Sequence, residues 1–240
     1  MCPGKNIPDS ETREKMTEQI FDDWPDRYDR WFETPIGKLV RAYEQELVLE
    51  LLAPRPGERI LDVGCGTGIF TAGFLAKGAS VVGLDISLSM LRRAQRRAGK
   101  APFVAVAGDM ARLPFAGDSF DRVASITAIE FFRDGAAAVA ELFRVARPGA
   151  PVVVASLNRL SPWAERRKAQ AASGEKPIFR NAVFRSPGEL LACAPVAGEA
   201  RTAIHFLKDE DPERARALET GGREQRRETG AFVVARWMKP

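Results

Sequence analysis

Short apolar runs rich in β-branched residues recur through the first two thirds of the chain. The first, at residues 60–63, is bounded by Pro56 and Gly57 on one side and by glycines on the other, as is typical of a buried parallel strand. Comparable runs follow at residues 80–84, 103–107, 120–126 and 152–156. Stretches with a helical spacing of apolar residues separate these runs, so the pattern predicts an α/β fold with a mostly parallel sheet.

The predicted helices have recognisable ends. Helices are predicted over residues 39–52, 69–77, 87–97 and 136–146. Pro54 stops the first helix, Gly78 ends the second, and Ser87 is the predicted N-cap of the third. Four arginines between residues 92 and 97 are expected on a solvated face of the third helix. Their positive charges interact favourably with the negative, C-terminal end of the helix dipole.

The C-terminal third departs from this alternation. Residues 157–185 carry basic and aromatic side chains and interrupt the order of elements, so we expect a lid-like insertion over the carboxyl edge of the sheet. The last two strands are predicted at residues 200–207 and 231–237, with a charged stretch at 208–229 between them. His205, the only histidine, alternates with apolar neighbours in the first of these strands and is expected to be structural.

A glycine-rich turn follows the first strand. Gly64, Gly66 and Gly68 fall within five residues, where positive φ and close approach of a ligand to the backbone are both predicted. The helix that opens from this turn points its unpaired N–H groups at whatever the turn holds. The next strand delivers Asp85 at its carboxyl end, where open α/β sheets bind ligands. A carboxylate there suits the hydroxyls of a ribose.

The spacing of the glycines separates two classes of cofactor. The dinucleotide motif G-x-G-x-x-G/A needs Gly or Ala at position 69, but this chain has Ile69, so a nicotinamide oxidoreductase is not expected. The segments ILDVGCGTG (residues 60–68) and VVGLD (residues 81–85) resemble the first two motifs of class I S-adenosylmethionine (SAM) dependent methyltransferases. Within that class, the chain looks most like the small-molecule branch that includes the ubiquinone and menaquinone biosynthesis methyltransferases.

This resemblance implies a fold and a domain organisation. The expected fold is a Rossmann-like three-layer sandwich, in which a mostly parallel seven-stranded sheet ends in an antiparallel hairpin. Residues 1–52 would form an N-terminal tail and helical cap, and residues 53–240 the SAM-binding methyltransferase domain, with residues 157–185 as its lid-like insertion.

The resemblance also implies which residues hold the cofactor. The glycine turn would hold the methionine part of SAM and Asp85 the ribose, while Asp109 and Met110 would hold the adenine. Asp109 also fits the N-cap of a helix. Tyr28, in an aromatic segment before the first predicted helix, would lie over the cofactor. The predicted cofactor-binding residues are Tyr28, Gly64, Cys65, Gly66, Gly68, Asp85, Ile86, Met90, Asp109, Met110 and Thr127.

Residues near the reactive centre are predicted after the fourth strand. The sequence there is Thr-Ala-Ile-Glu at residues 127–130, which differs from the N/D-P-P-Y/F of methyltransferases that alkylate adenine or glutamine nitrogen. Glu130 could orient an acceptor or take its proton, or it could be a helix N-terminal acid favoured by the dipole. Phe131, together with Trp163 and Arg166 of the insertion, is predicted to contact the acceptor. A basic, aromatic lid suits an anionic or aromatic substrate.

Composition and charge change this picture little. The 240 residues suit one domain with attachments, and the net charge of +4 arises from interspersed charges, so nucleic acid is not expected as a partner. Three widely separated cysteines (Cys2, Cys65 and Cys193) argue against both a disulfide framework and a metal site, and fit a reducing cytoplasm. No apolar run approaches the roughly 20 residues of a membrane helix, and no apolar secretion signal is apparent.

The predicted protein is therefore a cytoplasmic SAM-dependent methyltransferase. It would move a methyl group from SAM to a small-molecule acceptor by in-line displacement and leave S-adenosylhomocysteine. A general base is needed only for some acceptors. We expect a monomer or a homodimer. Two alternatives remain open at this point: an RNA or protein methyltransferase, and a regulatory protein that binds SAM without catalysis.

Overall fold

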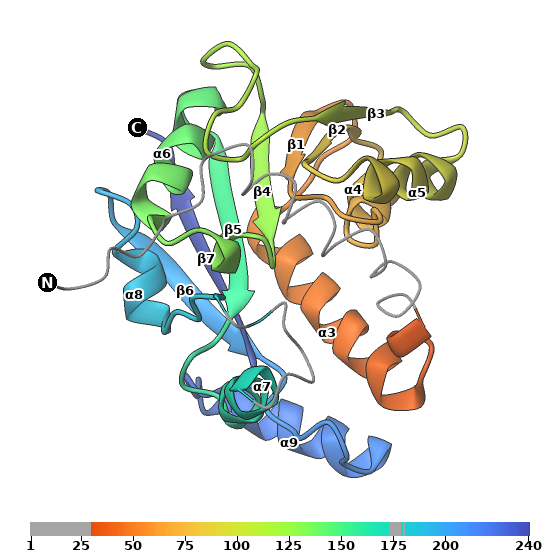
Figure 1. Ribbon diagram of the computed structural model, residues 1–240, viewed down its shortest axis with the longest axis vertical. Coiled ribbons are helices and arrows are strands. Elements are labelled where there is room, and N and C mark those ends of the chain that lie inside the picture. The colour runs from red at the N-terminus through yellow and green to blue at the C-terminus, as the bar shows by residue number, and fades with distance from the viewer. Residues whose placement is uncertain (1–29, 173–178, 180) are drawn as a thin grey trace, which may run out of the picture.

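A computed structural model describes residues 30–172, 179 and 181–240, and it shows a seven-stranded sheet flanked by helices (Figure 1). The strands are β1 (Arg59–Val63), β2 (Ser80–Asp85), β3 (Phe103–Ala107), β4 (Arg122–Ile126), β5 (Pro151–Leu157), β6 (Gly198–Ala203) and β7 (Phe232–Met238). The helices are α3 (Pro35–Leu52), α4 (Thr71–Ala76), α5 (Leu88–Ala98), the 3-10 helix η1 (Ile129–Phe131), α6 (Gly135–Val145), α7 (Pro162–Ala172), α8 (Pro187–Leu191) and α9 (Pro212–Glu224). Tyr28 lies outside the described residues.

The order of the strands places the carboxyl ends of β1 and β4 side by side. Across the sheet the order is β3-β2-β1-β4-β5-β7-β6. The first five of these strands pair in parallel, whereas β7 is antiparallel to both β5 and β6. The winding of the chain reverses between β1 and β4, which is where sheets of this kind bind ligands. The predicted mostly parallel sheet with an antiparallel end is confirmed.

Alternate side chains of the central strand β1 serve two separate cores. Ile60 packs into a core that α3, α4 and α5 cover, whereas Leu61 and Val63 pack into a core that α6 and α8 cover. Figure 1 shows these two groups of helices on opposite sides of the sheet. The molecule therefore has the predicted three layers.

The helices after the first two strands differ in how well the sequence marks their ends. The predicted helix over 69–77 is shorter, because Ile69 and Phe70 form a turn and the N-cap Phe70 offers no side-chain hydrogen bond. In contrast, α5 begins as predicted at Ser87, whose hydroxyl accepts a hydrogen bond from the N–H of Met90, and it ends at Gly99.

The C-terminal region differs more from the prediction. The strand β6 ends at Ala203 because Ile204 adopts a φ of 67°, which breaks the extended backbone. His205 therefore follows the strand instead of lying within it. Helix α9 occupies the charged stretch between the last two strands, where the sequence predicts no helix. It begins at Asp211, whose carboxylate accepts hydrogen bonds from two backbone N–H groups of the first turn.

The helices of the described ranges are short or amphipathic. The longest of them, α3, has 18 residues, and α9 has 13. Within the part of the chain that the structure describes, no helix combines the length and the apolar character that crossing a membrane requires.

Candidate functional site at the carboxyl edge of the sheet

The three glycines of the turn after β1 all have positive φ: 72° at Gly64, 54° at Gly66 and 77° at Gly68. A Cβ atom at Gly64 would lie 2.4 Å from the Cβ of Ala128, and one at Gly68 would lie 3.1 Å from Ala94. At Gly66 no atom of the described residues lies within 4 Å of that position. Gly64 and Gly68 therefore let the turn pack against its neighbours, while Gly66 presents bare backbone to open space.

Asp85 at the end of β2 is bonded to this turn. One carboxylate oxygen accepts a hydrogen bond from the N–H of Gly66 at 2.8 Å, and the other accepts one from the N–H of Ser87 at 2.9 Å. Burial raises the pKa of Asp85, while these backbone donors lower it. Each carboxylate oxygen has a second lone pair, so Asp85 can fix the turn and still accept a hydrogen bond from a ligand hydroxyl.

Several predicted cofactor residues turn their side chains into the protein. The side chain of Cys65 is buried, and its Sγ lies 2.9 Å from the position of a Cβ at Gly83. Burial raises the pKa of this thiol well above its ordinary value. Met90 and Met110 are also buried, whereas Ile86 is half-buried. Cys65, Met90 and Met110 can therefore meet a ligand mainly through their backbone atoms.

Asp109 lies at the same edge of the sheet as Asp85. The strands β2 and β3 run in parallel with Asp85 opposite Ala107, so both acids follow the carboxyl ends of neighbouring strands. The carboxylate of Asp109 accepts a hydrogen bond from the N–H of Ala111 at 2.9 Å. This bond caps a turn, and no helix of the described residues follows before β4.

A buried acid within β1 was not among the predicted site residues. Asp62 is 1% exposed and accepts a hydrogen bond from the hydroxyl of Thr71 at 2.6 Å. Burial raises the pKa of Asp62 to about 7, with the bond from Thr71 lowering it and the charge of Asp85 raising it. The bond joins β1 to the first residue of α4, so it fixes both ends of the glycine turn. The sequence feature that could have identified Asp62 is an acidic residue inside an apolar run, because a buried charge needs a partner.

The chain turns sharply where β4 ends. Thr127 has a φ of 51°, and its N–H donates a hydrogen bond to the carbonyl of Ala155 at 2.9 Å. This turn brings Ala128 against Gly64. The end of β4 and the glycine turn are therefore in direct contact.

Glu130 follows in the 3-10 helix η1 and is 1% exposed. Neither oxygen of its carboxylate accepts a hydrogen bond of good geometry from the described residues. Burial raises the pKa of Glu130 to about 7, although nearby backbone N–H groups and the charges of Arg167 and Arg185 lower it. Because η1 has only three residues, a helix dipole does not account for an acid at this place. Glu130 is a buried carboxyl that can take or release a proton near neutral pH.

Two further ionisable groups face Glu130 from distant parts of the chain. Glu44 of α3 is 9% exposed, and burial raises its pKa to about 8, with Arg167 lowering it and Glu130 raising it. Arg167 of α7 also lies over the rings of Trp163 and Phe179, at 5.2 Å and 5.8 Å from their centroids. Neither residue is among those that the sequence predicts for the site. The available signal in the sequence was that Glu44 lies four residues after Val40 and three before Leu47, so it falls on the apolar face of the helix.

The last residues of the insertion hold the backbone around Glu130. The guanidinium of Arg185, which is 6% exposed, donates to the carbonyls of Ile129 at 3.1 Å and Phe132 at 2.7 Å. The N–H of Val183 donates to the carbonyl of Glu130 at 2.7 Å. The insertion therefore fixes the position of the acid, a role that its sequence does not indicate.

The structure separates the three residues predicted to contact an acceptor. Phe131 is half-buried beside Glu130. Trp163 is 7% exposed, and its indole N–H donates to the carbonyl of Phe206 at 2.7 Å. Arg166 is exposed and forms an ion pair with Asp209 at 3.0 Å. The structure thus brings Phe131 and, through Arg167, Trp163 towards Glu130, but it places Arg166 at the surface.

Comparisons with known proteins bear on the same part of the chain. Residues 61–154 match the methyltransferase domain family, a range that contains the glycine turn, Asp85, Asp109 and Glu130. A demethylmenaquinone methyltransferase of Beutenbergia cavernae is 38% identical over 145 residues, which are 60% of this chain and 59% of that protein. A malonyl-(acyl-carrier protein) O-methyltransferase of Serratia marcescens is 31% identical over 166 residues, 69% of this chain and 64% of that protein. The chain thus spans about three fifths of the length of these curated relatives.

Solved structures share the fold. One from Thermotoga maritima, described as a SAM-dependent methyltransferase and possible histamine N-methyltransferase, has a TM-score of 0.71 at 24% identity. The match covers 93% of this chain and 99% of that one. This likeness establishes the Rossmann-like fold of the chain.

Proposed function

We propose that this chain, of which residues 61–154 match the methyltransferase domain family, is an enzyme that transfers a methyl group from SAM to a small-molecule acceptor by in-line displacement. One observation carries the proposal: the bare backbone of Gly66 lies beside the carboxylate of Asp85, which accepts its N–H at 2.8 Å. A ligand that bonds to both must combine a part that fits against backbone with a part that offers hydroxyl groups.

The residues at this edge fit SAM. The backbone of the turn at Gly64, Cys65, Gly66 and Gly68 would hold the methionine part, and Asp85 would accept the ribose hydroxyls. Asp109 and the backbone of Met110 would hold the adenine. When bound, SAM supplies a methyl group on a positively charged sulfur and leaves as S-adenosylhomocysteine. Tyr28, Ile86, Met90 and Thr127 complete the proposed cofactor site.

Glu130 is the proposed general base. It lies past the end of β4, next to the turn that carries Gly64, and its buried carboxylate has a pKa of about 7. A carboxyl group with such a pKa can accept a proton from an acceptor at neutral pH and release it afterwards. Glu44 and Arg167 set the charge around it. Burial of the two carboxyl groups, Glu130 and Glu44, keeps water from competing for the proton.

The ability of Glu130 to accept a proton helps to identify the class of acceptor. A carboxylate acceptor, as in the malonyl group named for one set of relatives, has no proton to lose. A phenolic hydroxyl or an aromatic ring carbon must lose one when it is methylated, and the other set of relatives is named for demethylmenaquinone. We therefore favour a phenolic or quinol-type small molecule. Phe131 and Trp163 would contact its ring, while Arg166 stays a weaker candidate because it pairs with Asp209.

The rest of the proposal concerns organisation and setting. Residues 1–52 would act as a cap and residues 157–185 as a lid, since α7 contributes Arg167 and the end of the insertion holds Glu130. We place the protein in the cytoplasm, as a monomer or homodimer without a nucleic acid partner. Cys65 and Cys193 are free thiols, in keeping with a reducing compartment.

Calorimetric titration with S-adenosylhomocysteine, and with NAD as the control ligand, tests the cofactor. We expect micromolar binding of S-adenosylhomocysteine alone. Asp85→Ala should weaken it at least about tenfold, since a charge-assisted hydrogen bond contributes roughly 1.5–3 kcal/mol. Asp211→Ala is the matched control, because it also removes a carboxylate that accepts two backbone hydrogen bonds. Binding of NAD, or equal affinity in the Asp85→Ala variant, would contradict the proposal.

A further inference from the structure

The sheet has two edge strands, β3 and β6, which differ in charge. Along β6, Glu199 and Arg201 form ion pairs with Arg236 and Glu50, at 3.2 Å and 2.6 Å. The residues of β3, in contrast, are all uncharged. Proteins commonly place charged residues on an edge strand, because its unpaired backbone groups can otherwise pair with a strand of another molecule. The edge at β3 lacks this protection.

The backbone of β3 directs hydrogen-bonding groups away from the sheet. The N–H of Gly108, directly after the strand, donates to the carbonyl of Asp85 in β2 at 3.1 Å. Alternate residues of a strand point their backbone groups to opposite sides, so those of Ala107, Ala105 and Phe103 point away from β2. Among the described residues, no strand pairs with β3 on that side. The outer side of β3 therefore offers N–H and carbonyl groups to a further strand.

Exposed apolar side chains accompany this edge. Four large apolar residues are exposed in the described part of the chain, and the two with the highest exposed fractions are Val104 of β3, at 58%, and Leu88 of α5, at 55%. Helix α5 packs on the face of β3 that carries Phe103, whereas Val104 lies on the other face. Each face of the sheet thus has an exposed apolar side chain in this region.

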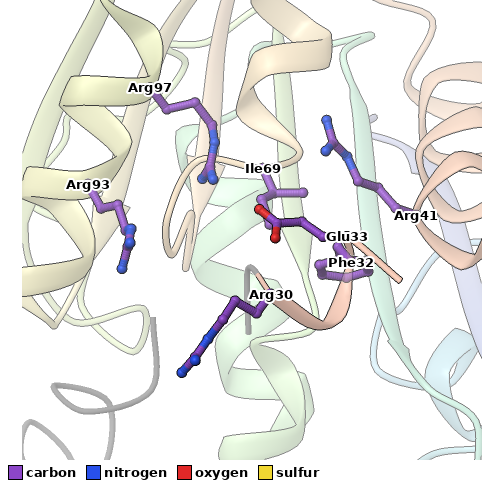
Figure 2. A pocket seen from close by; sticks show the side chains of 7 residues that line it. All are labelled: Arg30, Phe32, Glu33, Arg41, Ile69, Arg93 and Arg97. Carbon is purple, nitrogen blue, oxygen red and sulfur yellow. The ribbon is translucent and has the colours of Figure 1, made fainter. Parts of the chain in front are cut away.

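Two arginines of α5 point away from the edge. Figure 2 shows Arg93 and Arg97 reaching from α5 into a pocket whose opposite wall includes Arg41 of α3. At about 3.6 residues per turn, Leu88 and Gln95 lie on the opposite flank of α5. Because α3 packs against the inner strands β4, β5 and β7, this opposite flank is directed towards the outer edge of β3. The flank of α5 at the edge is therefore uncharged.

A second copy of β3 fits this edge in antiparallel orientation. About a two-fold axis at Ala105, the two copies of this residue would exchange N–H and carbonyl hydrogen bonds. The N–H of Ala107 would donate to the carbonyl of Phe103 in the other copy. The same register places Val104 directly opposite Val106, so the exposed valine would be covered by an apolar side chain.

The charges that flank β3 favour the same arrangement. Lys100 is exposed before the strand and Asp109 is half-buried after it, and no residue from 101 to 108 is charged. Antiparallel pairing brings the start of one strand next to the end of the other, so Lys100 of each copy would approach Asp109 of the other. Parallel pairing would instead bring like charges together.

We propose that the outer edge of β3 is the surface at which two copies of this chain associate, so that their sheets join into one continuous sheet. The two α5 helices would then face each other with their uncharged flanks. Apart from Asp109, this surface uses none of the residues of the proposed cofactor site, so the inference stands independently of the proposed methyl transfer.

Sedimentation equilibrium of the full chain over a range of concentrations tests the inference. A strand pair with few side chains is a small interface, so we expect a dimer with a dissociation constant of about 1–100 μM. Val104→Glu should weaken the dimer at least about tenfold, because it removes an apolar contact and sets two carboxylates diagonally across the strand pair. Met238→Glu is the matched control, since Met238 is an exposed apolar residue of β7, away from this edge.

A second variant tests the charges at the ends of the strand. Lys100→Glu should weaken the dimer about threefold or more, because it brings a carboxylate towards Asp109 of the other copy. Lys77→Glu is its matched control, since Lys77 is an exposed lysine at the end of α4. Circular dichroism checks that all four variants are folded.

Three results would overturn the inference. The wild-type chain could stay monomeric over the whole range, which would exclude a second copy and leave the edge to a strand of another protein. A dimer could persist unchanged in Val104→Glu and Lys100→Glu, or the control variants could weaken it equally, and either result would place the interface elsewhere. A dimer that fails to bind S-adenosylhomocysteine would reject the proposed function and leave this inference standing.

Discussion

The two halves of the candidate site are built in different ways. The proposed cofactor half, comprising the glycine turn, Asp85 and Asp109, comes from one continuous stretch that forms β1 to β3 and the helices between them. The proposed acceptor half, comprising Glu44, Glu130, Arg167 and Arg185, comes from four segments that the fold brings together. The first half is held by side-chain hydrogen bonds within the stretch from β1 to β2, such as the bond from the N–H of Gly66 to Asp85, 19 residues later. The second half depends on how α3, η1 and residues 157–185 pack.

This difference shows why one half can be shared and the other specialised. Local geometry in the cofactor half follows from residue types at fixed spacing, so it can serve many reactions unchanged. The acceptor half can change with the insertion and with α3 while β1 to β3 keep their positions. The two halves meet where Ala128 contacts Gly64.

The largest expected effect comes from removing the proposed base. Glu130→Gln keeps the shape of the side chain but cannot accept a proton, so turnover with a quinol acceptor should fall by about 10²–10⁴. Affinity for S-adenosylhomocysteine should stay within about twofold, because the change lies in the acceptor half. In the wild type, turnover should rise with pH through the pKa of Glu130, about 7, and the variant should lose this dependence.

Steady-state kinetics and calorimetry on the same preparations test this separation. Glu165→Gln is the matched control, because Glu165 is an exposed acid of α7 with 73% of its side chain accessible. Turnover that is unchanged in Glu130→Gln would remove Glu130 from the mechanism. A parallel loss of cofactor affinity would show that the halves are not separable.

A smaller effect should follow from Glu44→Gln, seen in the pH dependence of stability. Burial raises the pKa of Glu44 from 4.5 to about 8, so between these values the folded state binds a proton that the unfolded state has lost. Wild-type stability should therefore fall as pH rises across this range. The Glu44→Gln variant has no carboxyl group at this position, so its stability should not fall in this way. The difference in free energy of unfolding, variant minus wild type, should therefore be larger at pH 8 than at pH 5 by about 1–3 kcal/mol.

Denaturant unfolding at the two pH values measures this difference. Glu46→Gln is the matched control, since Glu46 lies two residues away on α3 with 60% of its side chain accessible. An identical pH dependence in wild type and Glu44→Gln would mean that Glu44 is already ionised in the folded protein. The acceptor half would then carry more negative charge than we infer.

Much of the fold and of the cofactor half could be predicted from sequence, because local interactions determine them. Ser87 caps α5 with its own side chain, and Gly64, Gly66 and Gly68 adopt the positive φ that their turn requires. Asp85 falls at the end of a strand because the apolar run stops there. These features depend on neighbours within a few residues.

The parts that could not be predicted depend on contacts between distant segments. Glu44 is one charged residue on an amphipathic helix, and only the packing of η1 and α7 shows that it is buried beside Glu130. Arg185 acts on carbonyls more than 50 residues earlier in the chain. Helix α9 buries few apolar side chains, so its apolar spacing was too weak to predict it, although Asp211 followed by a proline is a recognisable start.

The most direct test of the account compares two glycines. Gly66 and Gly149 both have positive φ, at 54° and 74°, and at both a Cβ would meet no described atom within 4 Å. Alanine at either position should therefore cost similar backbone strain, about 1 kcal/mol.

The measurement is calorimetric titration of both variants with S-adenosylhomocysteine. We predict that Gly66→Ala weakens binding at least about tenfold, because its methyl group occupies the space of the cofactor, and that Gly149→Ala binds as the wild type does. Wild-type affinity in Gly66→Ala would contradict the assignment of the glycine turn as the cofactor site.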